Sequence, residues 1–256
     1  MVLLLFVELD PDLAALRPLG PFFAVRPLPG TAGEPARPLP TLAHAYGILT
    51  SDVYGNPLTF RVRKVAAALR APEPRVAASV AHLGLAARLW SIALGCAARY
   101  GRLPDLDPGL LHWDPDGGAP EDLWLREVRP GAPADADGLA DAVLLGHLEP
   151  LAAALRSGHR LAPGLLRGNA ASALVGAARE TDRWARANGV PGTGERTRAL
   201  AAELLTHPLL SGTGTLTGTS FRRRSCCLYY RIPGGGVCGD CCFPSPPRSS
   251  PHAASG

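Results

Sequence analysis

The stretch of residues 75–100 constrains the fold more than any other part of this chain. It is rich in Ala and Leu, and Pro72 and Pro74 come just before it, where prolines commonly open a helix. Apolar side chains recur along it in steps of three and four residues, which is the period of one helix face. These positions are Val76, Val80, Leu83, Ala87, Trp90 and Leu94. We therefore predict a long buried helix with one apolar face.

Three further stretches, 137–156, 163–187 and 194–205, carry apolar residues at helical spacing, and we expect them to pack with the first helix as a bundle. Two short apolar patches, 110–113 and 123–128, are separated by Asp, Pro and Gly, a pattern that predicts a small hairpin. The predicted fold class is mainly α (α+β): a helical body, a few short strands and a small cysteine-rich region near the carboxyl end.

The composition indicates a globular chain of modest charge. Hydrophobic residues make up 46% and charged residues 19% of 256 positions, and a chain of this length buries a core without covalent staples. The net charge is +4, and its one dense basic run, 222–224, is too short to follow a nucleic-acid duplex. We therefore expect no nucleic-acid partner.

The start of the chain lacks the features of a secretion signal. Its apolar run has no basic leader, and Glu8 and Asp10 follow early. No stretch approaches about 18 consecutive apolar residues, so we expect no stable membrane insertion. The expected location is the cytoplasm, where thiols stay reduced and clustered cysteines more often hold metal than form disulfides.

The chain divides into four predicted parts. Residues 1–40 form an N-terminal segment with a Pro-rich linker, and residues 41–210 form the helical body. Residues 211–243 hold the cysteines, and the Ser-, Gly- and Thr-rich stretch that opens this part is expected to be a loop; it lacks the third glycine of a dinucleotide fingerprint. Residues 244–256, rich in Pro and Ser, are predicted to be disordered.

Five of the six cysteines lie within residues 226–242. Four thiolates satisfy either one tetrahedral zinc ion or the two irons of a [2Fe–2S] cluster. Cys238 and Cys241 have the Cys-x2-Cys spacing of a zinc turn, but Cys226 and Cys227 are adjacent. Adjacent side chains in an extended chain point to opposite sides, so directing both sulfurs at one ion strains the backbone. The spacing favours a binuclear cluster and leaves zinc open.

The pattern Cys-Cys-x10-Cys-x2-Cys, within RRRSCCLYYRIPGGGVCGDC, resembles the C-terminal signature of FhuF-like ferric-siderophore reductases. The resemblance is tight over about the last tenth of the chain and loose over the helical body. It implies a [2Fe–2S] cluster held by Cys226, Cys227, Cys238 and Cys241. Cys242 falls outside the pattern and is not counted as a ligand. Cys96, alone in the first predicted helix, is expected to be a core residue.

The resemblance also implies a function, namely transfer of one electron to an Fe(III)–siderophore. Siderophore oxygens hold Fe(III) far more tightly than Fe(II), so reduction releases the metal in the cytoplasm. No catalytic residue beyond the cluster is expected. Four arginines next to the cysteines are candidates to stabilise the added electron and to bind an anionic chelate. They are Arg222, Arg223, Arg224 and Arg231.

No flavin or nicotinamide fingerprint is visible, so we expect a separate electron donor, an unknown reductase or a ferredoxin. Two other functions stay open. One is a zinc-stabilised binding module without redox activity. The other is an iron–sulfur electron-transfer protein that serves another acceptor.

Overall fold

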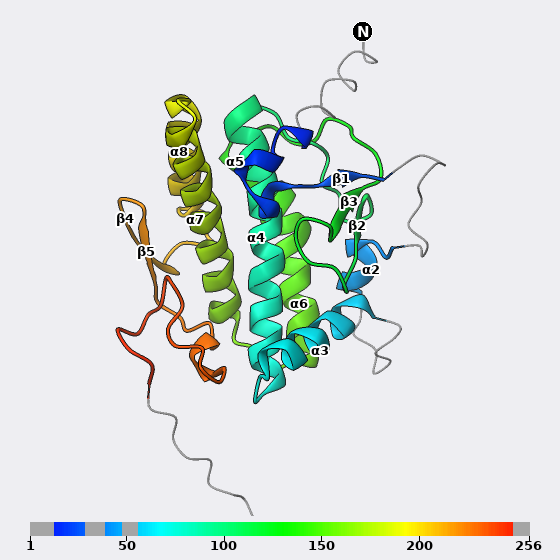
Figure 1. Cartoon of the computed structure of the whole chain (residues 1–256), viewed down its shortest axis with the longest axis vertical. Coiled ribbons are helices and arrows are strands. Elements are labelled where there is room, and N and C mark those ends of the chain that lie inside the picture. The colour runs from blue at the N-terminus through cyan, green and yellow to red at the C-terminus, as the bar shows by residue number, and fades with distance from the viewer. Residues whose placement is uncertain (1–12, 29–38, 48–55, 248–256) are drawn as a thin grey trace, which may run out of the picture.

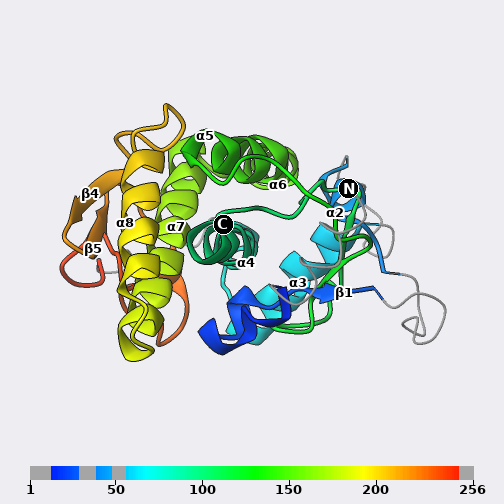
Figure 2. The same cartoon turned by 90° about the horizontal axis from the view of Figure 1, so that it is seen from above.

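The structure, a computed structural model, describes residues 13–28, 39–47 and 56–247. Helix α4 (Pro74–Tyr100) runs through its middle, with other helices on several sides (Figures 1 and 2). Pro74 opens this helix, and Gly101 closes it with a positive φ of 68°. The three consecutive residues 92–94 are completely buried. The long buried helix is therefore confirmed, but a single apolar face was too narrow a description because neighbours cover α4 on more than one side.

The predicted helical bundle is confirmed around α4. Its helices are α3 (Pro57–Leu69), α5 (Ala136–Leu139), the π-helix η3 (Ala140–Leu148), α6 (Glu149–Gly158), α7 (Pro163–Ala187) and α8 (Pro191–Leu204). Helix α7 packs along α4, α8 packs on α7, and α3 packs elsewhere on α4. Helices α5, η3 and α6 follow one another without a break, and a short helix, α2 (Leu42–Tyr46), packs on α6.

The predicted hairpin is also confirmed, as part of a three-stranded sheet. Strands β2 (Leu111–Trp113) and β3 (Leu123–Leu125) pair antiparallel, with Leu111 opposite Leu125. The third strand, β1 (Arg26–Pro27), pairs parallel to β3 and so brings the N-terminal segment to the same sheet.

A second hairpin corrects the expectation of a loop at residues 211–220. Strands β4 (Gly214–Thr217) and β5 (Ser220–Arg223) pair antiparallel, with Leu216 opposite Phe221. Gly218 has a positive φ of 60° in the turn between them. The Thr residues that suggested a linker are β-branched and suit a strand, and Phe221 is buried in the core.

The N-terminal segment shares the core of the helical body. Of two short 3₁₀ turns, η1 (Arg17–Leu19) contacts α7 and η2 (Pro21–Phe23) lies against α4, where Phe23 is buried. Arg88 of α4 is only 2% exposed. It bonds Asp122 at 2.9 Å and donates to three backbone carbonyls of the N-terminal segment, those of Pro21, Phe22 and Ala24. The Pro-rich linker over 29–38 and the tail from residue 248 lie outside the described residues, and the division into four parts stays a prediction.

Two helical stretches, α4 and Ala136–Gly158, are long and apolar enough to cross a membrane by length and composition alone. The expectation of no membrane span rested on the lack of about 18 consecutive apolar residues, and single polar residues such as His82 and Arg88 interrupt the apolar stretch of α4. The mean hydropathy of the stretch is nevertheless high enough for a membrane span. In α4, 78% of the apolar window is buried inside the protein, so its place in the core accounts for its composition.

Candidate metal centre

The cysteine segment, residues 226–242, is held against α4 and α7 at the lower left of Figure 1. The Ser79 hydroxyl of α4 donates to the Cys227 carbonyl at 2.7 Å. The buried Asp240 carboxylate accepts hydrogen bonds from Ser172 at 2.5 Å and from Arg179 at 2.8 Å, both on α7. Contacts to both helices therefore fix the two ends of the segment that carry the cysteine pairs.

A tight turn returns the chain between the two cysteine pairs. A 3₁₀ turn, η4 (Tyr229–Arg231), leads into Gly234, Gly235 and Gly236. A Cβ on Gly235 would lie 2.7 Å from the Tyr229 carbonyl oxygen, so only glycine fits there. The turn brings Cys238 back to Cys227, and their Sγ atoms are 3.3 Å apart.

Backbone N–H groups already point at two other sulfurs. The Leu228 N–H donates to Cys226 Sγ at 3.2 Å, and the Phe243 N–H donates to Cys241 Sγ at 3.4 Å. Such bonds stabilise thiolates and are among the interactions that set the reduction potential of iron–sulfur clusters. No disulfide joins any of the six cysteines, all of which lie in the described part of the chain.

The described cysteines place thiols near one another without forming a single-ion site. Cys227 and Cys238 have their Sγ atoms close together, but within the described ranges no three Cys, His, Asp or Glu side chains come together in a way that would hold one metal ion. Two irons need only two thiolates each, and Cys226, Cys227, Cys238 and Cys241 would supply the four thiolates that a [2Fe–2S] cluster takes.

Hydrogen bonds among the sulfurs split their pKa values. Contacts with the thiols of Cys226 and Cys238 lower the pKa of Cys227 to about 2, although burial opposes its ionisation. The same bonds raise the pKa of Cys226 and of Cys238, and burial raises the pKa of Cys242. A metal that replaces the shared protons therefore meets sulfurs that are already close together.

The four arginine candidates have very different surroundings. Arg222 is exposed and donates to the Cys242 carbonyl at 3.3 Å, and Arg224 is also exposed. Arg231 pairs with Glu73, just before α4. Burial opposes ionisation of Glu73, but hydrogen bonds from Arg75 and Arg231 outweigh it and lower its pKa. Arg223 is only 2% exposed and lines a groove, unlike its exposed neighbours, and its assignment to substrate stays a prediction.

Arg223 also extends a buried network that the sequence did not reveal. Its Nη2 donates to Asn169 Oδ1 at 2.7 Å, and Asn169 Nδ2 donates to the Ser79 carbonyl at 2.9 Å. The Nε and Nη1 groups of Arg223 have no partner among the described residues. A polar Asn in the middle of an apolar helical stretch was the available signal for this network. Cys96 is buried in the core, as expected.

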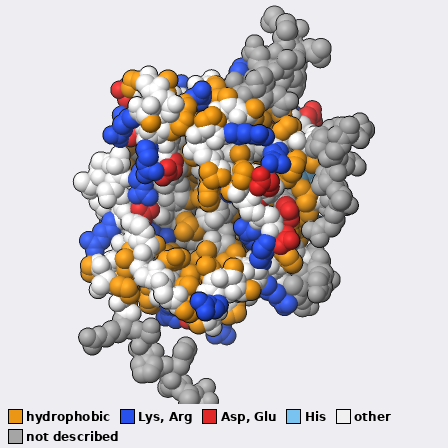
Figure 3. All heavy atoms as spheres, in the orientation of Figure 1, with side chains coloured by type: hydrophobic (Ala, Val, Ile, Leu, Met, Phe, Trp, Pro, Cys, Tyr) orange, Lys and Arg blue, Asp and Glu red, His pale blue; other side chains and the backbone are white. Residues whose placement is uncertain are grey.

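A groove of about 500 Å³ ends at Cys238. Its walls come from η2, α4, α7, β5 and the cysteine segment, and include Phe22, Leu83, Gly176, Arg179 and Arg223. Figure 3 shows hydrophobic side chains gathered on this side of the molecule, with Arg and Lys side chains around them. The groove thus offers a small molecule mainly apolar walls and direct access to one cysteine of the cluster motif.

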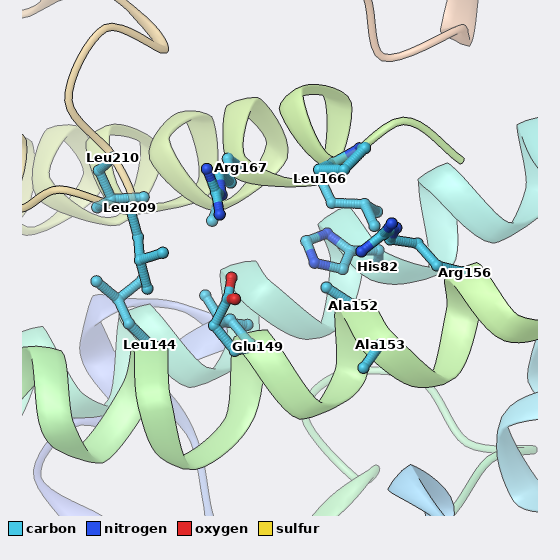
Figure 4. A pocket seen from close by; sticks show the side chains of 13 residues that line it. His82, Leu144, Glu149, Ala152, Ala153, Arg156, Leu166, Arg167, Leu209 and Leu210 are labelled. Carbon is cyan, nitrogen blue, oxygen red and sulfur yellow. The ribbon is translucent and has the colours of Figure 1, made fainter. Parts of the chain in front are cut away.

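A second, smaller cavity of about 80 Å³ lies between α4, α6 and α7. Figure 4 shows His82 reaching into it from α4, with Glu149, Arg156 and Arg167 around the same space. The Nδ1 atom of His82 has no partner among the described residues. Burial, with a further contribution from the charge of Arg223, lowers the pKa of His82 to about 3, so its ring is neutral.

Comparison with protein families supports the metal centre. Residues 223–243 match the family model described as the FhuF 2Fe-2S C-terminal domain. No curated protein matches the chain. The resemblance noted from the cysteine pattern is confirmed, and the clustered cysteines together with this match indicate a [2Fe–2S] cofactor.

Proposed function

We propose that this protein is a [2Fe–2S] ferric-siderophore reductase that acts in the cytoplasm. It passes one electron to an Fe(III)–siderophore chelate, and the chelate then loses its iron as Fe(II). The observation that carries the proposal is the FhuF-type segment 223–243, whose cysteines are free of disulfides and held against α4 and α7.

The proposed ligands are Cys226, Cys227, Cys238 and Cys241. A [2Fe–2S] cluster bound by them supplies one electron at a time. The chain itself provides N–H donors to the sulfurs of Cys226 and Cys241, and it ties the Cys227 carbonyl to Ser79. These contacts hold the thiolates in place before and after the electron moves.

The groove beside Cys238 is the proposed place for the chelate. Its volume of about 500 Å³ lies in the range of small-molecule sites, so it can take at least part of a chelate. Among its charged side chains, Arg179 pairs with Asp240 at 2.8 Å, whereas Arg223 has no ion-pair partner in the described part of the chain. A chelate in the groove would touch a cluster ligand, and the exposed Arg222 and Arg224, which flank Arg223 in the sequence, would attract an anionic one.

Loss of iron follows from the chemistry of the metal. Fe(III) is a hard ion that charged oxygen donors hold tightly, whereas Fe(II) has a lower charge and prefers softer ligands. The electron has to come from a separate donor, an unknown reductase or a ferredoxin, because the sequence carries no flavin or nicotinamide fingerprint.

Anaerobic purification followed by an absorption spectrum tests the cofactor. We expect a red-brown protein with visible charge-transfer bands and with iron and acid-labile sulfide in equal amounts. Chemically reduced protein should then be reoxidised quickly by ferric siderophores. A colourless protein with one zinc ion per chain would identify a zinc-stabilised module, and indifference to every ferric chelate would identify an electron-transfer protein with another acceptor.

Two cysteine variants test the ligand set. We expect Cys238→Ser to prevent normal cluster assembly, because it removes one of the four thiolates. Cys242→Ser, the matched control in the same segment, should leave the visible spectrum nearly unchanged. Equal loss of the spectrum in both variants would show that the proposed ligand set is wrong.

A further inference from the structure

We infer that Arg223 is a positioning residue of the metal centre, whose unpartnered N–H groups donate hydrogen bonds to the sulfur shell of the cluster and thereby raise its reduction potential. The inference rests on the proposed function in that it requires a cluster bound by the cysteine segment.

The alternation of strand β5 directs Arg223 inward. Phe221 and Arg223 are buried, whereas Arg222 between them and Arg224 after them are exposed. Successive side chains of a strand point to opposite faces, so three consecutive arginines of identical chemistry receive opposite environments. Only the middle one is placed beneath the cysteine segment, where its backbone N–H donates to the Asp240 carbonyl at 3.0 Å.

The charge of Arg223 lacks a counter-charge within the described residues. Its Nη2 bonds only neutral groups, the Leu165 carbonyl at 3.2 Å and Asn169 Oδ1 at 2.7 Å. Its Nε and Nη1 are buried and unpartnered, and no carboxylate in the described part of the chain forms an ion pair with it. An unpaired buried cation is strongly destabilising, so this arrangement calls for an anion next to the guanidinium.

The cluster ligands would supply that anion, because Arg223 is tied to both ends of the cysteine segment. Its backbone N–H bonds the Asp240 carbonyl, and its side chain is linked through Asn169 and Ser79 to the Cys227 carbonyl. Arg223 and Cys238 also line the same groove. A cluster held by four thiolates carries net negative charge, and reduction adds one more. The unpartnered donors of Arg223 therefore suit this cluster, and they suit its reduced form most.

The guanidinium is held in place by contacts on its far side. Asn169, which accepts from Arg223, also donates to Ser79, and Ser79 donates to the Cys227 carbonyl. Gly168 of α7 leaves the necessary space, because a Cβ there would come within 3.0 Å of Arg223 Nη2. A donor fixed in this way does not have to reorganise when the electron arrives, which is how preorganised dipoles stabilise new charge.

The test compares Arg223→Gln with Arg222→Gln and Arg224→Gln, two matched controls that remove the same charge from exposed neighbours. The readout is the midpoint potential of the cluster, from a redox titration followed by its absorption. In Arg223→Gln the cluster loses hydrogen bonds from a charged donor, and we expect the equilibrium constant for reduction to fall about tenfold. For a one-electron couple this fall corresponds to a midpoint potential lower by about 59 mV. The two controls should shift the potential much less, and less still at high salt.

Arg223→Lys keeps the charge without the planar fork and should fall between wild type and Arg223→Gln. If Arg223→Gln assembles the cluster and its potential equals that of Arg222→Gln, the inference is wrong.

A measurement on the unmodified chain guards against variants that fail to assemble the cluster. In protein labelled with ¹⁵N-arginine, pulsed electron paramagnetic resonance of the reduced cluster should show a nitrogen coupling through the hydrogen bonds, and Arg222→Gln should keep it. A normal cluster spectrum without any arginine coupling overturns the role of Arg223 but leaves the reductase proposal intact. Absence of a cluster from the wild-type protein overturns the reductase proposal itself.

Discussion

The ion pair between Arg88 and Asp122 is expected to hold the N-terminal wall of the groove in place. Both side chains are nearly inaccessible, at 2% and 5% exposure, and Arg88 also bonds the carbonyls of Pro21, Phe22 and Ala24. Removing one member of such a pair leaves a buried charge without a partner, which costs about 3–5 kcal/mol. We therefore expect Asp122→Ala to lower the free energy of unfolding by that amount.

Urea unfolding near neutral pH, followed by tryptophan fluorescence and circular dichroism, measures this loss. The neighbouring Glu121 provides a matched control, because it pairs with Arg26 at a similar distance, 2.8 Å, but on the surface. Glu121→Ala should cost no more than about 1 kcal/mol. The double variant Arg88→Met/Asp122→Leu leaves no unpaired charge and should cost clearly less than the two single changes together. The expected role of the pair would be refuted by a loss below about 1 kcal/mol in Asp122→Ala. It would also be refuted if the loss in the double variant equalled the sum of the losses in the two single variants.

The remaining predictions concern acid stability and the groove. His147 is buried, its Nε2 donates to the Leu106 carbonyl at 2.6 Å and its Nδ1 accepts from the Tyr46 hydroxyl at 2.8 Å. Burial lowers the pKa of His147 to about 4 despite the Leu106 bond. Between that value and about 6.5 the unfolded chain therefore binds more protons than the folded protein, and the free energy of unfolding falls as the pH drops through this window. Between about pH 7 and about pH 5.5, His147→Gln should lose about 1 kcal/mol less stability than the wild type, because His82, whose pKa burial also lowers, contributes to the loss in both proteins; an equal loss in both would contradict the assignment. Gly176→Trp on α7 should fill the groove, because a Cβ at this position would have no neighbour within 4 Å. This variant should slow reoxidation of the reduced protein by ferric siderophores but not by ferricyanide, whereas the control Gly192→Trp on α8 should slow neither reaction. Unchanged rates with siderophores in Gly176→Trp would place the chelate elsewhere.

Helix positions could be predicted well because their signals are local. The stretch 163–187 was predicted with the same bounds that α7 has, since Pro163 opens it and apolar residues keep helical spacing along it. The hairpin at 214–223 was missed because Thr, Ser and Gly are common in loops as well as in short strands, and its pairing with the buried Phe221 depends on packing against the core.

The candidate site divides in the same way. The cysteine spacing indicated the cofactor, but it did not reveal Asn169 or Ser79, which lie far away in the sequence and meet the cysteine segment only through the packing of α4 on α7. The groove was likewise absent from the sequence signals, because its walls come from parts of the chain that are far apart in the sequence.

A helical bundle and a cysteine pattern suited to a [2Fe–2S] cluster could both be predicted from the residues alone, because helix period and ligand spacing lie in neighbouring residues. Folding settles which of three consecutive arginines is buried under the cysteine segment. That choice depends on how β5 alternates once it docks against α7 at Gly168, and docking between distant segments leaves no periodic trace in the sequence.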